Sequence, residues 1–569
     1  MKNLEIAVIF REIAKILEIQ GENVFRKRAY ERAAQNIEGL SQNIEEFMKT
    51  HKLTDIPGVG NDLAGKIEEY LKTGKIKSFE VLKKTIPSGI VDMLNIPSIG
   101  PKTVKVFYEK LKIKSLQDLE NAIETGKLKG LPGIKEKKIH NILKGLEIHK
   151  KGLERLNLAR AAFVADGVLK ALQSTPEVKK ISAAGSLRRQ KETVRDIDIL
   201  VVSDKPGKVM STFTNIPYVK DILAKGDTKS SVRTTEDVQV DCRVVKEESF
   251  GAALVYFTGS KSFNIKLRQL AIKKGLKVNE YGVFRKNKFV AGNTEEDVFK
   301  ILGLPYIEPE LRENSGEIEL ALKQKLPQLI ELKDLKGDLH VHSKYSDGAN
   351  TIEDIAAACR DMGYSYVAVA DHSKSLRIAG GLYLADLKRK KIEIDKVNKK
   401  FKDFRVLFGT EVEIDSEGRI DYEDKVLKEF DVVVAAVHTG FKQSKEHLTK
   451  RVARACENKY VHIIAHPTGR LWGTREGYDI DLEKVFKAAA ETNTHMEINS
   501  FPSRLDLNDW QCRRAKEMGV SVAINTDSHT LNQLEAIKFG ISVARRGWLS
   551  KENVINTLPL ENLLKKLKK

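Results

Sequence analysis

The spacing of apolar residues predicts that the first 150 residues form a bundle of helices. Apolar side chains recur every three or four positions between Leu4 and Leu17 and again between Ala29 and Ile37, which is the period of a helix with one buried face. A short phrase lies between later helical segments and occurs three times: Ile-Pro-Gly-Val-Gly at 56–60, Ile-Pro-Ser-Ile-Gly at 96–100 and Leu-Pro-Gly-Ile-Lys at 131–135.

The repeated phrase has two interpretations. A Pro-Gly between two helices can be only a turn. Three copies favour helix-hairpin-helix elements, in which glycines let the backbone approach a DNA phosphate and the next helix points its N–H groups at it. On this interpretation Gly58, Gly60, Gly100 and Lys102 contact DNA without regard to base sequence. The third copy, with Lys135 in place of the last glycine, can be structural.

Two β-branched runs in the middle of the chain predict strands that carry carboxylates. The run 196–202 alternates at its start, so Asp196 and Asp198 lie on one face and isoleucines on the other. The run 238–245 offers Asp241. If the strands are adjacent, three carboxylates converge and can hold two divalent cations roughly 3.5 to 4 Å apart, an arrangement suited to in-line phosphoryl transfer. Taken alone, Asp-x-Asp can equally be the polar outer face of a sheet.

From residue 336 onward, β-branched runs alternate with helical segments, and polar residues follow nearly every run. This pattern predicts a (β/α) barrel whose site lies at the C-terminal ends of the strands. The candidate metal ligands are His340, His342, Asp347, His372, Glu411, His438, His466, Asp527 and His529. A single histidine after a strand is more often structural, and we interpret His447, His462 and His495 in that way.

The mixed donor set of the barrel predicts its chemistry. Imidazole and carboxylate together suit Zn²⁺, Mn²⁺ or Fe²⁺. Nine ligands are enough for two or three ions, with Glu411 as the bridging group. Such a cluster generates hydroxide at neutral pH and binds a phosphate, which indicates phosphoester hydrolysis. From its position, Arg470 is a candidate for holding that phosphate.

Composition adds a polyanionic partner to this picture. A chain of 569 residues is too long for one core, so several domains are expected. Lys and Arg number 98 against 79 Asp and Glu, a net charge of +19 that favours nucleic acid, although the excess can also be spread over a solvated surface. The four cysteines are scattered, which argues against a disulfide or zinc-thiolate framework. No signal peptide or membrane-spanning run is evident, so a cytoplasmic protein without a membrane partner is expected.

The stretch 185–202, in which Gly-Ser and paired arginines precede Asp-x-Asp, resembles the nucleotidyltransferase palm of the family X DNA polymerases. The resemblance implies that Asp196 and Asp198 bind two Mg²⁺ or Mn²⁺ ions and that Asp241 is the base for the primer 3′ hydroxyl. The nucleotide-binding residues that it implies are Gly185, Ser186, Arg189, Tyr256, Phe257, Gly259, Asn264 and Arg268. Tyr256 and Phe257 would screen the sugar 2′ position, although taken alone their sequence predicts a strand end.

Two further features belong to this resemblance. Lys66 aligns with the Schiff-base lysine of relatives that remove 5′-deoxyribose phosphate, while a solvated helical lysine is the other interpretation. The barrel resembles the polymerase-and-histidinol-phosphatase (PHP) domain, with all nine ligand positions filled. This implies a Mn²⁺-dependent 3′ to 5′ exonuclease, with abasic-site endonuclease or 3′-phosphatase as further activities. The palm-plus-PHP order is that of bacterial and archaeal family X enzymes.

We therefore predict a multidomain chain: α-helical helix-hairpin-helix domains at 1–80 and 81–150, an α+β nucleotidyltransferase palm at 151–247, a thumb at 248–315, a helical linker at 316–335, and a distorted TIM-like PHP barrel at 336–569. The predicted function is a monomeric repair enzyme that fills short DNA gaps with dNTPs and trims 3′ ends. The alternatives are a polymerase whose barrel hydrolyses small phosphate esters, and a DNA-end-binding scaffold with inactive sites.

Overall fold

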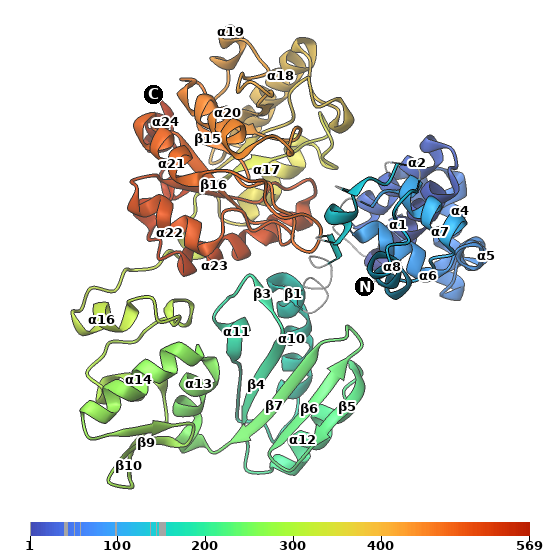
Figure 1. The fold of residues 1–569 in the computed structure, drawn as a ribbon. Coiled ribbons are helices and arrows are strands. Elements are labelled where there is room, and N and C mark those ends of the chain that lie inside the picture. Colours follow the sequence, from blue (N-terminus) through green and yellow to red (C-terminus); the bar gives the residue numbers. More distant parts are fainter. Residues whose placement is uncertain are drawn as a thin grey trace.

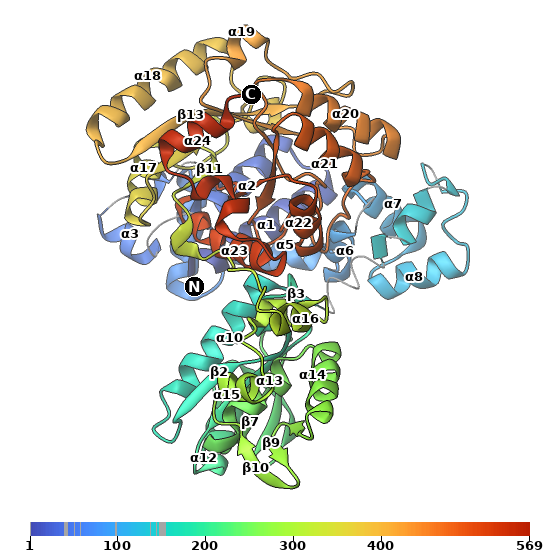
Figure 2. The same ribbon diagram turned by 90° about the vertical axis from the view of Figure 1, so that its left-hand side faces the viewer.

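A computed structural model describes the chain apart from residues 1, 39–43, 51, 57, 97–98, 132, 137, 144 and 147–154. In Figure 1 the C-terminal barrel, in yellow to red, lies above the green palm and thumb, and the blue N-terminal helices lie to one side. Figure 2 shows the same three parts after a quarter turn. Within the described residues, no helix combines the length and the apolar character that crossing a bilayer requires.

The first part is helical, as the apolar spacing predicts. Its α-helices include α1 Lys2–Gln20, α2 Val24–Glu38, α3 Ile44–Thr50, α4 Asn61–Thr73, α5 Lys77–Thr85, α6 Ser88–Asp92, α7 Pro101–Leu111 and α8 Leu116–Glu124. One apolar core runs from Ile6 on α1 to Leu146, and Phe10 packs edge-on against Tyr30 at 5.4 Å. The apolar face of each helix is therefore buried against its neighbours.

The palm is a five-stranded sheet with strand order β2-β4-β7-β6-β5. Its strands are β2 Lys180–Ala183, β4 Asp196–Val202, β5 Val219–Lys225, β6 Lys229–Thr234 and β7 Gln239–Val245. The short strands β1 Leu156–Asn157 and β3 Thr193–Val194 pair with each other beside it. The helices α10 Leu158–Gln173 and α12 Pro206–Asn215 share an apolar core with Ile197 and Ile199 of β4. Leu200 belongs to the other face, where it packs against Leu254.

The thumb combines helices with a small antiparallel sheet. Its elements are α13 Phe250–Thr258, α14 Lys261–Lys273, β8 Lys277–Asn279, β9 Gly282–Arg285, β10 Lys288–Ala291 and α15 Glu295–Ile301. The strand end predicted at Tyr256 is wrong, because this segment is the last turn of α13. Gly251 lets this helix pack closely against the start of α15, since an added Cβ would lie 2.0 Å from the backbone of Thr294. In the predicted linker, α16 Glu317–Leu322 follows the thumb and packs into its core.

The barrel is a parallel sheet of seven strands in sequential order. The strands are β11 Gly337–Val341, β12 Tyr366–Val369, β13 Arg405–Glu413, β14 Val432–Ala436, β15 Ile463–Ile464, β16 His495–Asn499 and β17 Val522–Asn525. The α-helices around it include α17 Ile352–Asp361, α18 Leu384–Lys400, α19 Asp424–Leu427, α20 Lys445–Glu457, α21 Leu482–Glu491, α22 Asp509–Glu517, α23 Ile537–Arg546 and α24 Leu560–Leu567. A bridge between Val341 and Ser528 joins the first and last strand ends. The predicted TIM-like barrel is confirmed.

The barrel and the palm are joined by polar contacts at the loop that precedes β4. Arg470 of the barrel pairs with Glu192 of this loop at 2.6 Å, and it also donates to the backbone carbonyl of Arg504 at 2.8 Å. Ser542 of α23 donates to the side chain of Gln190 at 2.9 Å. Arg470 thus bridges the two domains, and its guanidinium group is already engaged by protein acceptors instead of facing the barrel cluster as a phosphate ligand.

Candidate active sites of the palm and the barrel

The palm aspartates lie on one face of two adjacent parallel strands. In the register of β4 and β7, Asp198 is directly opposite Asp241, and Asp196 lies two residues earlier on the same face of β4. The side chain of Gln239 donates a 3.0 Å hydrogen bond to Asp241. The adjacency of the two strands, which the sequence left open, brings the three predicted carboxylates to one end of the sheet.

Electrostatics at this site favour a bound cation. Burial and then the charges of Asp196 and Asp241 raise the pKa of Asp198 to about 7. An oxygen-only donor set of this kind suits Mg²⁺ or Mn²⁺, whose charge would offset the repulsion. Among the described residues, all groups of side chains that lie close enough to share one ion are in the barrel. The three palm carboxylates are therefore farther apart than the barrel ligands.

Gly185 lies directly against the side chain of Asp198 in the palm site. It has a φ of +63°, and a Cβ at this position would lie 2.3 Å from Oδ2 of Asp198. It begins the short helix α11 Gly185–Arg188, which also holds Ser186. Because both the left-handed backbone and the close approach require a residue without a side chain, the predicted Gly-Ser turn is fixed by the carboxylate beneath it.

The paired arginines after this turn are engaged by the thumb. Arg188 makes a bidentate pair with Glu295 at 2.8 and 2.6 Å. Arg189 donates to Glu313 at 3.0 Å and also to the backbone carbonyl of Thr258. Such charge-assisted pairs are strong, so these guanidinium groups hold the palm and thumb together.

The residues expected at the nucleotide sugar gather around the end of α13. The rings of Tyr256 and Phe257 meet edge to face at 5.1 Å, and the guanidinium group of Arg243 lies 4.7 Å from the centre of the Phe257 ring. Asn264 donates to the carbonyl of Tyr256 at 2.6 Å, and Arg268 donates to the carbonyl of Asn264 at 3.2 Å. Gly259 follows α13 with a φ of +71°. Sequence reasoning missed Arg243, which lies on the strand of Asp241 and extends this aromatic platform.

The glycines of the first two hairpins take the predicted positions. Gly58 has a φ of +80°, and Gly60 and Gly100 are the N-caps of α4 and α7. The free N–H groups of both helices therefore follow a glycine. Lys102 lies in the first turn of α7, but its side chain is outside the described part of the structure, as are Pro57, Pro97, Ser98 and Pro132.

The predicted lyase residue, Lys66, projects from α4 next to two side chains. Its ammonium group pairs with Asp62, one helical turn earlier, and lies 6.0 Å from the centre of the Tyr30 ring. A Schiff-base lysine must attack as a neutral amine with a free lone pair. The side chain of Lys66 is only 14% exposed, so it is not a fully solvated helical lysine, and the pair with Asp62 does not by itself make it catalytic.

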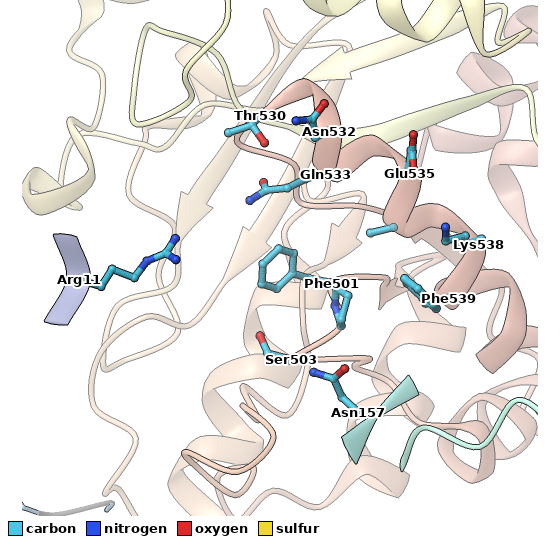
Figure 3. Close-up of a pocket in the computed structure, with 12 residues that line it drawn as sticks. Arg11, Asn157, Phe501, Ser503, Thr530, Asn532, Gln533, Glu535, Lys538 and Phe539 are labelled. Carbon is cyan, nitrogen blue, oxygen red and sulfur yellow. The ribbon is translucent and has the colours of Figure 1, made fainter. Parts of the chain in front are cut away.

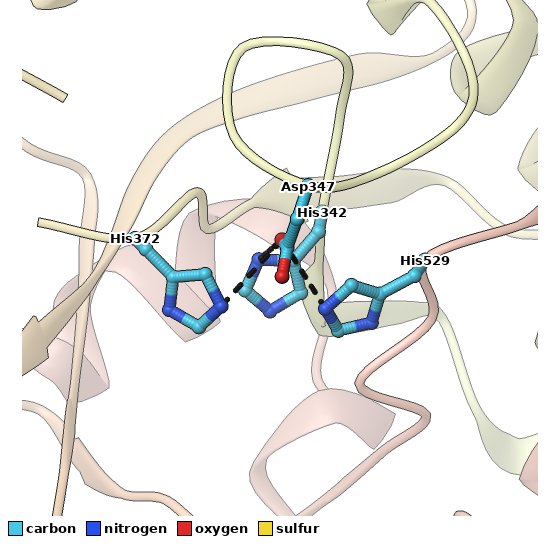
Figure 4. Close-up of side chains that lie close together, drawn as sticks. All are labelled: His342, Asp347, His372 and His529. Carbon is cyan, nitrogen blue, oxygen red and sulfur yellow. Dashed lines mark ion pairs between the residues drawn. The ribbon is translucent and has the colours of Figure 1, made fainter. Parts of the chain in front are cut away.

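The nine barrel residues come together at the C-terminal ends of the strands. His340 lies in β11 and Glu411 in β13, while the other seven lie in the loops that follow five of the strands. Figure 4 shows one group of four, in which Asp347 lies between His372 at 3.6 Å and His529 at 3.3 Å. The sets close enough to share one ion are His342, Asp347, His372 and His529; His340, His342 and Asp527; and His372, Glu411 and His438.

Glu411 occupies the centre of the cluster. One of its oxygens lies 2.7 Å from Nδ1 of His372, and the other lies 3.1 Å from Nε2 of His466 and 3.4 Å from Nε2 of His438. The Nε2 atoms of His340 and His342 lie 3.6 and 3.7 Å from the first oxygen. The carboxylate is thus placed between the imidazoles, as expected of a bridging ligand.

The state of the buried polar atoms fits metal binding. Nδ1 of His342 is buried without a hydrogen-bond partner, and Nδ1 of His372 and Oε2 of Glu411 lie 2.7 Å apart without the geometry of a hydrogen bond. Burial and the neighbouring histidines lower the pKa of His342 to about 4, which leaves a neutral imidazole that can bind an ion. Burial also lowers the pKa of His372, but Glu411 and Asp347 outweigh it and raise this pKa to about 10. The donor set is one that Zn²⁺, Mn²⁺ or Fe²⁺ accepts.

An outer layer of residues orients these ligands. Glu497, fully buried in β16, lies 2.7 Å from Nδ1 of His340 and accepts a hydrogen bond from the backbone N–H of His466 at 2.8 Å. Glu413 lies 2.8 Å from Nδ1 of His438. Sequence reasoning missed both residues. For Glu497 the usable signal was a single glutamate inside an apolar strand, because a buried carboxylate needs a partner.

The histidines interpreted as structural make other contacts or none. The ring of His462 accepts a 3.0 Å hydrogen bond from the backbone N–H of Val433, and His447 lies 2.8 Å from the carbonyl of Ser416. His495 is buried in β16 and its ring nitrogens have no partner. None of the three belongs to the metal-ligating sets found among the described residues.

Comparison with known proteins agrees with this arrangement. Family models match a helix-hairpin-helix domain at 1–76, a helix-hairpin-helix tandem at 90–147, a DNA polymerase beta thumb at 253–313 and a PHP domain at 338–500. The DNA polymerase/3′-5′ exonuclease PolX of Bacillus subtilis is 38% identical over 567 residues, 99% of each chain. The chain belongs to the family X DNA polymerases that carry a PHP domain. The predicted family is therefore confirmed.

Two other relatives match separate parts of this family X polymerase. DNA polymerase lambda of Rattus norvegicus is 27% identical over 344 residues, 55% of this chain and 56% of its own length. A probable phosphatase of Thermoanaerobacter sp. (strain X514) is 32% identical over 232 residues, 39% of this chain and 89% of its own length. DNA polymerase lambda and a probable phosphatase thus each resemble part of the chain.

Proposed function

We propose that this family X enzyme fills short gaps in DNA with its palm and degrades 3′ ends with its barrel. The observation that carries the proposal is that one chain holds two sets of converging ligands: half-buried carboxylates only in the palm, and mostly buried imidazoles with carboxylates in the barrel. Burying such groups is costly without a cation. This argues against a DNA-end scaffold with inactive sites.

In the palm, Asp196 and Asp198 would hold Mg²⁺ or Mn²⁺, which lower the barrier by offsetting charge on the triphosphate and on the attacking oxygen. Asp241 accepts the proton of the primer 3′ hydroxyl, whose oxygen bonds to the α-phosphorus as pyrophosphate leaves. The backbone of Gly185 and the hydroxyl of Ser186 bind the triphosphate at the start of α11. Arg189 contributes positive charge from beside Thr258.

The nucleotide and the template are held by the thumb and the helical domain. Tyr256 and Phe257 screen the sugar 2′ position, with Gly259 beside them, and Asn264 and Arg268 approach the minor-groove side of the new pair. The hairpins at 56–60 and 96–100 grip DNA phosphates, and the net charge of +19 supports this. Gap-filling should therefore weaken steeply as salt is raised.

In the barrel, the nine side chains would hold two or three Mn²⁺, Zn²⁺ or Fe²⁺ ions, which supply hydroxide for phosphodiester cleavage. Glu411 bridges the ligands and Glu497 fixes the ring of His340. The substrate is the 3′ end of a DNA strand. Cleavage at abasic sites and removal of 3′ phosphates use the same chemistry and are part of the proposal.

A second candidate for the barrel is hydrolysis of small phosphate esters. It is favoured by the 232-residue match to a probable phosphatase. Competition separates the two candidates. Unlabelled DNA ends are added to a Mn²⁺-dependent assay of monoester hydrolysis, and a chromogenic phosphate monoester is added to a Mn²⁺-dependent assay of DNA degradation. If DNA inhibits monoester hydrolysis and the ester hardly affects DNA degradation, DNA is the substrate. The reverse result makes the barrel a small-ester phosphatase.

Lyase activity at Lys66 is a separate part of the proposal. Borohydride should trap a covalent complex with 5′-deoxyribose phosphate ends in the wild type, and Lys66→Ala should lose it. Lys72→Ala is the control, because Lys72 is an exposed lysine of the same helix, paired with Glu68. An untrapped wild type would exclude the lyase and leave the polymerase assignment unaffected.

A further inference from the structure

A cavity of about 550 Å³ lies beside the barrel cluster and takes no part in either site described above (Figure 3). Phe501, Ser503, Thr530 and Gln533 line it from two rim loops of the barrel. Asn157, at the start of the palm, lines the opposite side. The size is that of a pocket for a small organic group such as a nucleoside.

The cavity walls are bonded to the metal-ligating residues. The loop of Phe501 follows β16, and the backbone N–H of Phe501 donates to Asn499 at 3.0 Å. Asn499 in turn donates to Oδ2 of Asp527 at 3.0 Å. On the other wall, the side chain of Gln533 accepts a 2.7 Å hydrogen bond from the backbone N–H of His529. The loops that form the cavity walls are therefore the ones bonded to Asp527 and His529 of the cluster.

The lining combines groups that suit a base and a sugar with three charged residues. In Figure 3 the ring of Phe501 projects into the cavity and the amide of Gln533 lies above it. The hydroxyl groups of Ser503 and Thr530 and the amide of Asn157 are neutral hydrogen-bonding groups. The charged residues on the lining are Glu535, Lys538 and Arg11 of α1, so positive charge is in excess, which favours an anionic strand end. An aromatic face with amides around it is the usual environment of an unstacked base.

We propose that this cavity binds the terminal nucleoside of a DNA 3′ end whose phosphate lies on the barrel cluster, with Phe501 stacked on the base. The proposal rests on the exonuclease function proposed above and adds the residue that recognises the strand end. It also gives the palm a part in the nuclease, because Asn157 forms one wall. Ends that carry a base are then preferred over ends or esters without one.

The test compares two 3′ ends in Mn²⁺: a normal nucleotide and a tetrahydrofuran abasic nucleotide. Phe501→Ala should lower kcat/KM for the normal end by about 5- to 150-fold, the range expected for loss of stacking of one base on an aromatic side chain. It should leave kcat/KM for the abasic end unchanged, and Phe501→Trp should restore kcat/KM for the normal end. Trp510→Ala is the control, since Trp510 is an exposed aromatic residue of α22 outside the cavity lining.

The outcomes distinguish a failure of the base-binding cavity from a failure of the proposed exonuclease function. An equal loss on both ends would show that Phe501 supports the structure of the site and would overturn base stacking, as would no loss on either end. If the wild type degrades neither end, the exonuclease function fails and the subsite fails with it. If the wild type degrades both ends, and Phe501→Ala loses activity only on the normal end, the exonuclease function and the base-binding cavity are both supported.

Discussion

The guanidinium group of Arg546, at the end of barrel helix α23, donates a 2.9 Å hydrogen bond to the backbone carbonyl of Arg189 in the palm. The same side chain, only 4% exposed, pairs with Glu313 at 3.0 Å and with Asp509 at 2.7 Å. Since Glu313 also accepts from Arg189, one arginine of the nuclease domain fixes both the thumb and the loop between Gly185 and the palm aspartates.

Replacing Arg546 should therefore impair the polymerase, although the residue belongs to the barrel. We expect Arg546→Ala to lower kcat/KM for single-nucleotide gap filling at least about tenfold, because small displacements of positioning groups reduce catalysis strongly. The kcat/KM of Arg546→Lys should lie between those of the wild type and Arg546→Ala, since lysine keeps the charge and lacks the planar guanidinium group. The control is Arg514→Ala, which removes a more exposed arginine that pairs with Glu483. Equal gap filling in Arg546→Ala and wild type would contradict the coupling.

Gly185→Ala should abolish extension while the fold persists. The new Cβ would fall 2.3 Å from Oδ2 of Asp198 in a backbone of positive φ, so the carboxylate must move. We expect extension to fall about 100-fold or more. Gly207→Ala in α12 is the matched control, because its Cβ meets open space. Steady-state primer extension measures both, and an active Gly185→Ala enzyme would show that the close approach is unimportant.

The raised pKa of Asp198 predicts how metal-free stability depends on pH. Its folded-state pKa of about 7 lies above the usual 3.8, so its contribution to stability is fully present below pH 3.8 and is lost as pH rises through 7. Asp198→Asn cannot lose a proton. In EDTA its melting temperature should rise relative to the wild type between about pH 5 and about pH 8.

Added Mg²⁺ should reverse this difference, because it binds the charged wild-type site and stabilises the folded state. Differential scanning calorimetry with and without Mg²⁺ provides the measurement. Parallel pH profiles for the two proteins in EDTA would mean that burial and the charges of Asp196 and Asp241 do not destabilise the ionised form of Asp198.

Glu497→Gln should weaken metal binding in the barrel and spare the palm. The carboxylate holds the ring of His340 and the backbone of His466. Loss of such an outer partner commonly lowers metal affinity or activity by about 10- to 100-fold. Mn²⁺ titration and the exonuclease assay should both show this, with extension unchanged. Glu483→Gln, at an exposed glutamate of α21, is the control; similar losses there would point to a general charge effect.

The spacing of apolar residues predicts the helices and strands that repeat with one regular period and bury one face. The spacing of Asp196 and Asp198 alone predicts that they lie on one side of a strand. The pairing of Asp198 with Asp241 depends on which strands are adjacent, which the family resemblance suggested and spacing does not encode.

Other features depend on contacts that no local pattern carries. The segment 250–258 is apolar all round, which suits a buried strand or a buried helix equally, and no local pattern shows that Gly251 packs against the backbone of Thr294. Arg546 reaches Arg189 across 357 positions of sequence. Arg470, expected at the phosphate, turned to Glu192 because the palm lies against the barrel rim.

The most direct test of two independent active sites is one primer-extension gel on gapped DNA in Mn²⁺. It compares the wild type with Asp196→Ala plus Asp198→Ala and with His340→Ala plus His342→Ala. We predict that the aspartate variant still shortens the primer and does not extend it, and that the histidine variant extends it and does not shorten it. Degradation that survives the histidine changes would show that the barrel is not the nuclease and would contradict the central claim.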